Sequence, residues 1–216
     1  MMKDRLQAQV TAELSWDPKV DSEDITVSAA GGVVTLHGTV RSVRHKREAG
    51  SAARRVHGVA SINSYLEVRI PDQGRRADDD VGADVRQALA LNGLIPATVR
   101  ARVEAGFVTL CGVATWQFQR DEAELVCAAV PGVVDVDVAI SLRQAPAVDG
   151  IQQAISAALR RRARLDRFEL SVDCPLPGLA VLSGAVSCCA ERDDAVAVAW
   201  SAPGITDVDN RIVVAY

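Results

Sequence analysis

The sequence predicts an α+β fold built from three tandem copies of one αββαβ module. A short strand-like segment bounded by glycines occurs three times, at residues 32–38, 106–112 and 178–184. After the closing glycine of each segment, another glycine follows at a distance of 20 residues, at Gly58, Gly132 and Gly204. A spacing that is kept three times together with the residue types indicates an internal repeat.

The copies cover residues 1–70, 75–144 and 148–216. Between them lie short polar stretches that contain proline and interrupt the apolar pattern, as linkers do. A chain of 216 residues is long enough for three small domains. Because a module of about 70 residues buries only a small core, we expect neighbouring copies to bury part of one another's surface.

Each copy begins with an amphipathic helix whose apolar side chains recur at every fourth position. These side chains are Leu6, Val10 and Leu14, then Val81, Val85 and Leu89, then Ile151, Ile155 and Leu159. Two extended runs follow, and the tight turn between them predicts an antiparallel hairpin. The first run covers residues 25–29, 99–105 and 168–174 in the three copies, and the glycine-bounded segment forms the second.

A second helix fills the interval between the glycines of each copy. Ser42, Thr115 and Ser187 lie near its start, where a hydroxyl side chain can cap the helix. Its core side carries small residues, so the helix can lie close to a sheet, and an alternating apolar strand follows it. A strand, helix and strand in one sheet require a right-handed crossover and a parallel pair. Each module is therefore predicted to be a three-stranded mixed sheet covered on one face by two helices.

Composition narrows the class of protein. The chain is 49% hydrophobic and 24% charged, which is typical of a globular protein, and no apolar run is long enough to span a membrane. The net charge of −4 gives no general attraction for nucleic acid. Five cysteines without a C-x-x-C spacing predict reduced thiols. With no apolar leader segment in the sequence as given, we expect a cytoplasmic protein.

The repeat resembles the BON domain (bacterial OsmY and nodulation), in which a G-x-V-x-L-x-G strand precedes a helix and a P-G-V turn. Residues 106–112 (GFVTLCG) and 131–137 (PGVVDVD) show this pattern in the second copy, and the other copies match nearly as well. His57 replaces the turn proline in the first copy, and Pro175 and Pro177 lie around the hairpin of the third. The resemblance implies a non-catalytic role in osmotic or envelope stress, with binding of phospholipid surfaces, and a periplasmic location as the alternative.

Basic residues form two clusters that are candidates for a membrane or partner surface. The first, on the second helix of the first copy, consists of Arg44, Lys46, Arg47, Arg54 and Arg55. The second, at the end of the first helix of the third copy, consists of Arg160, Arg161, Arg162 and Arg164. Each such charge contributes about 1 kcal/mol near an anionic lipid surface. The alternative is that these residues only solvate a helix face and oppose the helix dipole.

Two aromatic residues, Trp116 and Phe118, start the second helix of the second copy. They are candidates for insertion at a membrane interface, for filling a partner's pocket, or for packing against a neighbouring copy. Trp200 poses the same question in the third copy. Net charge also differs between copies, at +2 for residues 1–70 and −4 for residues 71–144. This asymmetry can decide which copies or subunits pack together.

The sequence contains no catalytic, phosphate-binding, dinucleotide or zinc motif. The three histidines all belong to the first copy and lack ligand spacing. The acidic side chains on the second helices are expected to be solvated, and these are Asp121, Glu122, Glu124, Asp193 and Asp194. We therefore predict that the chain is not an enzyme and has no catalytic, cofactor or metal site. Three functions remain: binding of anionic phospholipid surfaces, a protein-interaction scaffold that includes homo-oligomers, and sensing of a small ligand or ion.

Overall fold

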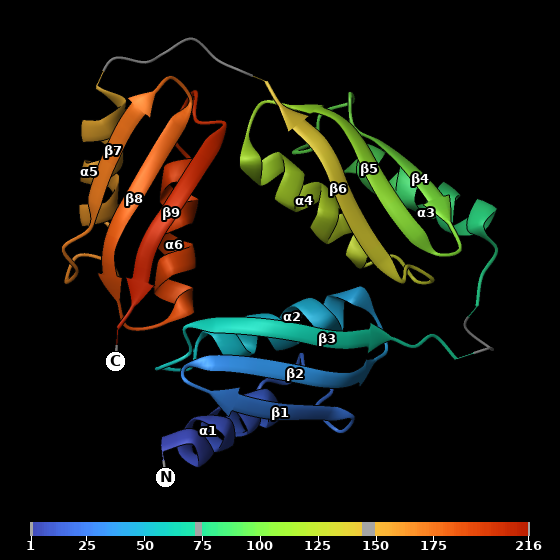
Figure 1. Cartoon of the computed structure of the whole chain (residues 1–216). Coiled ribbons are helices and arrows are strands. Elements are labelled where there is room, and N and C mark those ends of the chain that lie inside the picture. The colour runs from blue at the N-terminus through green and yellow to red at the C-terminus, as the bar shows by residue number, and fades with distance from the viewer. Residues whose placement is uncertain (1, 72–74, 144–149, 216) are drawn as a thin grey trace.

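The computed structural model describes residues 2–71, 75–143 and 150–215 and arranges them in three modules with the same order of elements (Figure 1). Module 1 consists of α1 (Met2–Trp16), β1 (Ile25–Ala30), β2 (Val33–Val40), α2 (Val43–Arg54) and β3 (Ser61–Val68). Module 2 consists of α3 (Asp78–Leu91), β4 (Arg100–Glu104), β5 (Phe107–Ala114), α4 (Gln117–Ala128) and β6 (Asp135–Leu142). Module 3 consists of α5 (Ile151–Arg160), β7 (Ser171–Leu176), β8 (Leu179–Val186), α6 (Cys189–Trp200) and β9 (Asp207–Val214). The predicted αββαβ repeat is confirmed.

The second strand of each module is the centre of a three-stranded sheet. The strand orders are β1-β2-β3, β4-β5-β6 and β7-β8-β9. In module 1, β2 runs antiparallel to β1, with Val34 opposite Ala29, and parallel to β3, with Val34 opposite Ile62. The same pairing recurs in the other two sheets. The sheets are therefore mixed, as predicted.

Both helices of a module pack on the same face of its sheet. In module 1 a single apolar core contains Val10 and Leu14 of α1, Val34 and Leu36 of β2, and Ala52 of α2. The equivalent side chains form the cores of modules 2 and 3. The opposite face of the sheet is exposed.

The exposed face carries several apolar side chains. Phe107 on β5 is 53% exposed, and Val33, at the equivalent position of β2, lies on the outward face of its own sheet. In module 1 the rings of His37 and Tyr65 stack there, with their centroids 5.0 Å apart. The residues that alternate with the buried ones on the central strands therefore give the outward faces a partly apolar character.

The first strand of module 3 begins later than the sequence predicted, at Ser171 instead of residue 168. Phe168 belongs to the preceding turn, because its N–H donates to the carbonyl oxygen of Leu165 at 3.0 Å. The Arg167 guanidinium also lies over the Phe168 ring, 4.6 Å from its centroid. Near Pro175 the pairing with β8 shifts register, because proline cannot donate to the ladder.

The second helices are capped in two different ways. In module 1 the prediction is confirmed, since the Ser42 hydroxyl accepts the N–H of the third helical residue at 3.2 Å. For Thr115 and Ser187 it was wrong, since the N-cap positions are Trp116 and Cys188, and a side chain of the first turn instead accepts a backbone N–H that precedes the helix. Gln119 reaches back to accept the N–H of Thr115 at 2.9 Å, and Glu191 accepts that of Ser187 at 2.8 Å.

The closing glycine of the repeated segment is required by the backbone. Gly38, Gly112 and Gly184 have φ angles of +134°, +131° and +134°. A Cβ atom at Gly184 would lie 2.6 Å from the carbonyl oxygen of Glu169, just before the first strand of the module. The same clash arises at Gly38 and Gly112. Only glycine lets the central strand approach that carbonyl group so closely.

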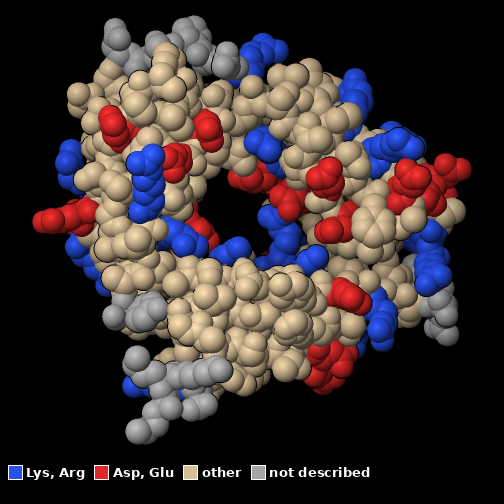
Figure 2. All heavy atoms as spheres, in the orientation of Figure 1, with Lys and Arg blue, Asp and Glu red and all other residues tan. Residues whose placement is uncertain are grey.

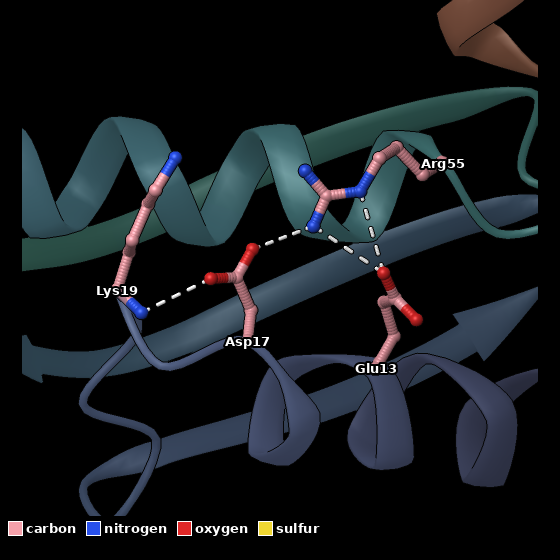
Figure 3. A network of polar contacts seen from close by, with 4 residues as sticks. All are labelled: Glu13, Asp17, Lys19 and Arg55. Atoms are coloured by element: carbon pink, nitrogen blue, oxygen red, sulfur yellow. Dashed lines mark hydrogen bonds and ion pairs between the residues drawn. The ribbon is translucent and has the colours of Figure 1, made fainter.

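A polar network connects the two helices of module 1 (Figure 3). Arg55, which follows α2, donates to Glu13 at 3.3 Å and to Asp17 at 2.6 Å. The backbone N–H of Lys19 also donates to Asp17, at 3.0 Å. These hydrogen bonds, first that of Lys19 and then that of Arg55, hold the pKa of the Asp17 carboxyl below its usual range.

The three modules surround a central opening. The second helices α2, α4 and α6 lie on the sides of their modules that face the other two (Figure 1). The opening is visible between the modules, with acidic and basic side chains around it (Figure 2). We call the contacts between neighbouring modules joints 3–1, 1–2 and 2–3.

Joint 3–1 is closed by the start of α6. Cys189, the first residue of α6, is fully buried in the core of module 1. Its N–H donates to the carbonyl oxygen of Val59 at 3.1 Å, and the Arg192 guanidinium donates to that of Ala60 at 3.0 Å. An ion pair joins Asp193 to Arg54 of module 1.

Joint 1–2 uses the equivalent part of α2. Val43, which corresponds to Cys189 after the repeat shifts of 72 and 74 residues, is buried in the core of module 2. Arg47 pairs with Glu124, and the Lys46 ammonium lies 3.9 Å from a carboxylate oxygen of Asp135. The expectation that neighbouring copies bury part of one another's surface is confirmed at both joints.

We expect Gly112→Ala to lower the free energy of unfolding by at least about 2 kcal/mol, because the backbone conformation and the carbonyl group of Thr98 both oppose a side chain there. Chemical denaturation measures the change. Gly50→Ala is the control, because Gly50 lies inside α2 and a Cβ there meets no described atom within 4 Å. This substitution is expected to raise stability by about 0.5–1 kcal/mol. Similar effects of the two substitutions would contradict this account of the repeated glycine.

We expect Arg55→Leu to raise the pKa of Asp17 toward its ordinary value, while the Lys19 N–H keeps part of the lowering. Because the folded pKa is lowered, the carboxylate stabilises the fold above the unfolded pKa of about 3.9, and this contribution is lost as pH falls through the folded value. Asp17→Asn should therefore destabilise the chain at pH 7 and lose its effect in acid.

Carboxyl NMR titration measures the pKa of Asp17, and thermal unfolding over a pH series measures the stability. Arg41→Leu serves as the control, because Arg41 pairs with Asp21 and not with Asp17. A pKa of Asp17 that stays the same in Arg55→Leu would refute the role of this network.

Candidate functional site

Joint 2–3 differs from the other two because it leaves a cleft open. The position of Val43 and Cys189 is taken here by the polar residue Gln117. A cavity of about 650 Å³ lies between the start of α4 and the part of α6 from Asp193 onward. It is lined by Trp116, Gln117, Phe118, Asp121, Asp193, Val196, Ala197, Trp200 and Ser201. We call it the α4–α6 cleft.

Aromatic side chains from both sides line the cleft. Trp116 and Phe118 belong to the first turn of α4 and its flank, with Trp116 half-buried and Phe118 exposed. Trp200, the last residue of α6, is half-buried and packs against the core of module 3. The two aromatic residues of α4 therefore lie where module 2 faces module 3.

Two carboxylates share the cleft with these rings. Asp121 accepts a hydrogen bond from the Gln117 amide at 2.8 Å. Loss of solvation is the largest effect on this carboxyl and raises the pKa of Asp121, while the Gln117 hydrogen bond opposes the rise and nearby Glu124 adds to it. Asp193, on the other wall, is the acid that pairs with Arg54 at joint 3–1.

Gln117 is oriented by a second neighbour. One terminal nitrogen of Arg120 donates to the Gln117 carbonyl oxygen at 3.2 Å, so the amide nitrogen of Gln117 turns to Asp121. The Arg120 Nε is buried and has no hydrogen-bond partner among the residues that the structure describes. The equivalent residue Arg192 reaches the neighbouring module at joint 3–1, whereas Arg120 turns back to its own helix.

The expectation that the acidic residues of the second helices lie on solvated helix surfaces is confirmed for Asp121 and Asp193, which are exposed, whereas Glu122, Glu124 and Asp194 are half-buried. Glu124, Asp193 and Asp194 form ion pairs with basic residues of other elements. Glu122 accepts a hydrogen bond from the Asn92 amide at 2.7 Å. Asp121 is exposed and accepts a hydrogen bond from Gln117. An alignment of the copies would have drawn attention to Asp121, because it occupies the position of Arg47 and Asp193, which form ion pairs across the other joints.

Most of the candidate basic residues of α2 and its flank take part in ion pairs. Lys46, Arg47 and Arg54 pair with acids of modules 2 and 3. Arg55 pairs within module 1. Arg44 is exposed and forms no ion pair with any described residue. The structure therefore places this cluster largely at joints 1–2 and 3–1.

The second basic cluster has a different environment. Arg160, Arg161, Arg162 and Arg164 are all exposed at the end of α5 and in the segment after it. Arg164 pairs with Asp194 at 3.2 Å, whereas the other three form no ion pair within the described part of the chain. Asp194 and Asp193 are consecutive on α6 and therefore point to different sides of the helix. The cluster thus lies on another side of α6 from the cleft.

Three further features bear on the type of site: possible metal ligands, helix length and the cysteines. Among the described residues, no group of three or more histidine, cysteine, aspartate or glutamate side chains is arranged to hold a metal ion. None of the helices in the described ranges combines the length and apolar character needed to cross a bilayer. The five cysteines are unpaired thiols, and burial raises the pKa of Cys127 to about 12.

Comparison with known proteins agrees with the repeated fold. A family model described as BON domain matches residues 3–70, 77–144 and 147–216. The Osmotically-inducible protein Y of Escherichia coli (strain K12) is 32% identical over 136 residues, which make up 61% of this chain and 68% of that protein.

Solved structures show a weaker likeness. The C-terminal domain of CdsD, a structural protein of the Type III secretion system of Chlamydia trachomatis, matches over 98% of both chains with 18% sequence identity and a TM-score of 0.26. A second CdsD structure matches over 98% of this chain and 92% of its own, with 17% identity and a TM-score of 0.25. The sequence match is the informative one, because the family model covers each of the three modules. The chain therefore belongs to the BON domain family and carries three tandem copies of the domain.

Proposed function

We propose that this chain is a non-catalytic binding protein of the osmotic stress response, and that it attaches to anionic phospholipid surfaces through Arg160, Arg161 and Arg162. The observation that carries the proposal is the exposure of these three arginines without an ion pair in the described part of the chain. Most of the other basic cluster is already paired with acids of the protein.

The similarity to Osmotically-inducible protein Y supports a role in osmotic stress. The family is generally non-catalytic, and the cleft brings carboxylates together with aromatic rings and an amide but no nucleophile paired with a base. A binding role therefore fits both the family and the residues present.

Electrostatics sets the expected strength of this attachment. Each arginine near an anionic surface contributes about 1 kcal/mol, so three of them favour binding by roughly 3 kcal/mol at low ionic strength. Salt screens such exposed charges beyond about 10 Å at 0.1 M. The attachment should therefore be reversible and sensitive to ionic strength.

We expect the chain to sediment with phosphatidylcholine vesicles that contain phosphatidylglycerol more than with vesicles of phosphatidylcholine alone, and to be released by 0.5 M salt, a concentration at which the screening length is about 4 Å. Replacing Arg160, Arg161 and Arg162 together by glutamine should weaken this added binding at least tenfold. A control variant removes three exposed charges elsewhere, at Arg41, Arg69 and Arg102. If both triple variants lose binding equally, net charge and not this segment governs attachment, and the proposal fails.

A protein-interaction scaffold is the second candidate function. It is favoured by the exposed apolar side chains on the outer faces of the sheets, of which Phe107, Tyr65 and Val213 are more than half exposed. These three residues lie on different sheets, one in each module, so each module offers its own exposed apolar side chain to a partner. Sedimentation equilibrium of the chain and of a Phe107→Ser variant tests this for the outer face of the module 2 sheet. Self-association of the original chain that the variant loses would support contact through that face.

A further inference from the structure

The three joints can be compared position by position, because the second helices correspond residue for residue. Arg47, Asp121 and Asp193 occupy one equivalent position on α2, α4 and α6. At joint 1–2, Arg47 pairs with the acid Glu124 of the next module. At joint 3–1, Asp193 pairs with the base Arg54. In both joints a charge at this position meets the opposite charge across the boundary.

At joint 2–3 the opposite charge is missing. The residues of module 3 that correspond to Glu124 and Arg54 are Val196 and Trp200, and both line the cleft that Asp121 also lines. The charged residue on the far wall is another acid, Asp193. An acid at joint 2–3 therefore faces a surface that supplies no base.

Basic residues on and beside α4 only partly compensate for the missing base. Arg120 and Arg47 lower the pKa of Asp121 through space, but less than loss of solvation raises it, and Glu124 of the same helix raises it further. Arg47 is itself paired with Glu124, and Arg120 donates to Gln117. The cleft thus holds two carboxylates, and none of its lining residues is basic.

We propose that the α4–α6 cleft binds a small organic cation of the quaternary ammonium class, with Asp121 as its counter-charge and Trp116 and Trp200 as its apolar walls. Such a ligand would supply at joint 2–3 the positive charge that Arg47 and Arg54 supply at the other joints. The faces of tryptophan rings attract methylated ammonium groups. A cavity of about 650 Å³ also lies within the range typical of small-molecule sites.

The lining favours this class over metal ions. Calcium and magnesium require several oxygen ligands held close together, and no group of three metal-binding side chains exists among the described residues. The cleft instead combines the carboxylates of Asp121 and Asp193, the second of which is paired with Arg54, with three aromatic rings and a valine. Weakly hydrated cations with apolar substituents suit such a surface.

We expect choline to bind the full chain with a Kd in the millimolar range, measured by titration calorimetry. Its uncharged carbon analogue, 3,3-dimethylbutan-1-ol, should bind at least tenfold more weakly. Asp121→Asn should weaken choline binding at least tenfold and leave the analogue unaffected. Asp137→Asn, which removes an exposed acid from β6, is the matched control and should bind choline as the original chain does. Equal binding of choline and its analogue, or an unchanged affinity in Asp121→Asn, would overturn the proposal.

Two further measurements separate recognition from a change in folding. Trp116→Leu keeps an apolar wall but removes the ring, and it should weaken choline binding about threefold or more while the melting temperature stays close to that of the original chain. Choline affinity should also decrease as pH falls through the pKa of Asp121, and this decrease should vanish in Asp121→Asn. A pH dependence that is identical in both proteins would assign the effect to other groups and refute the role of Asp121.

A free cation and a lipid headgroup both carry such a positive group, and vesicles of pure phosphatidylcholine distinguish the two sources. Retention on these vesicles that free choline abolishes indicates the headgroup. Binding of free choline without retention on vesicles indicates a soluble ligand. Failure to bind either would contradict the proposal, whereas attachment through Arg160, Arg161 and Arg162 is measured separately by its dependence on phosphatidylglycerol.

Discussion

The close packing of the second helix on the central strand is the constraint on which the rest of the structure depends. In module 1, Ala49, Ala52 and Ala53 are fully buried against this strand. Because these side chains are small, the helix lies near the sheet and its first turn is fixed relative to the strand. That first turn carries Val43 and, in module 3, Cys189, which enter the neighbouring cores. The arrangement of the modules therefore follows from how each second helix is seated.

Apolar burial, and not charge, holds joints 1–2 and 3–1 together. The side chains of the ion pair between Arg54 and Asp193 are each close to half exposed, and such pairs typically contribute less than about 1 kcal/mol. Burial of a side chain such as Val43 contributes more, about 1.5–3 kcal/mol. The charges instead select partners, since the basic helix α2 lies between the acidic residues of α4 and α6. The differing net charges of the copies already pointed to such selectivity.

The sequence was sufficient to predict the element order and the mixed sheets, because glycine spacing and apolar periodicity are properties of one module. It failed where a contact depends on a neighbouring element. Phe168 looked like part of a strand, but its turn and Arg167 hold it outside the sheet. The caps at Thr115 and Ser187 were assigned by residue type, whereas in the structure Gln119 and Glu191 accept the backbone N–H groups of these two residues. The cleft could not be inferred from one copy, because its walls come from two modules and its acid is conspicuous only beside Arg47 and Asp193.

The burial of Cys189 at joint 3–1 has a practical consequence. This thiol belongs to module 3 but is enclosed by module 1, and loss of solvation raises its pKa, so it is a poor nucleophile while the joint is closed. Separation of the two modules would expose it to solvent without unfolding either one. The rate at which a thiol reagent labels Cys189 would then report how often joint 3–1 opens. The exposed Cys111 on β5 would provide the reference rate for an accessible thiol in the same molecule.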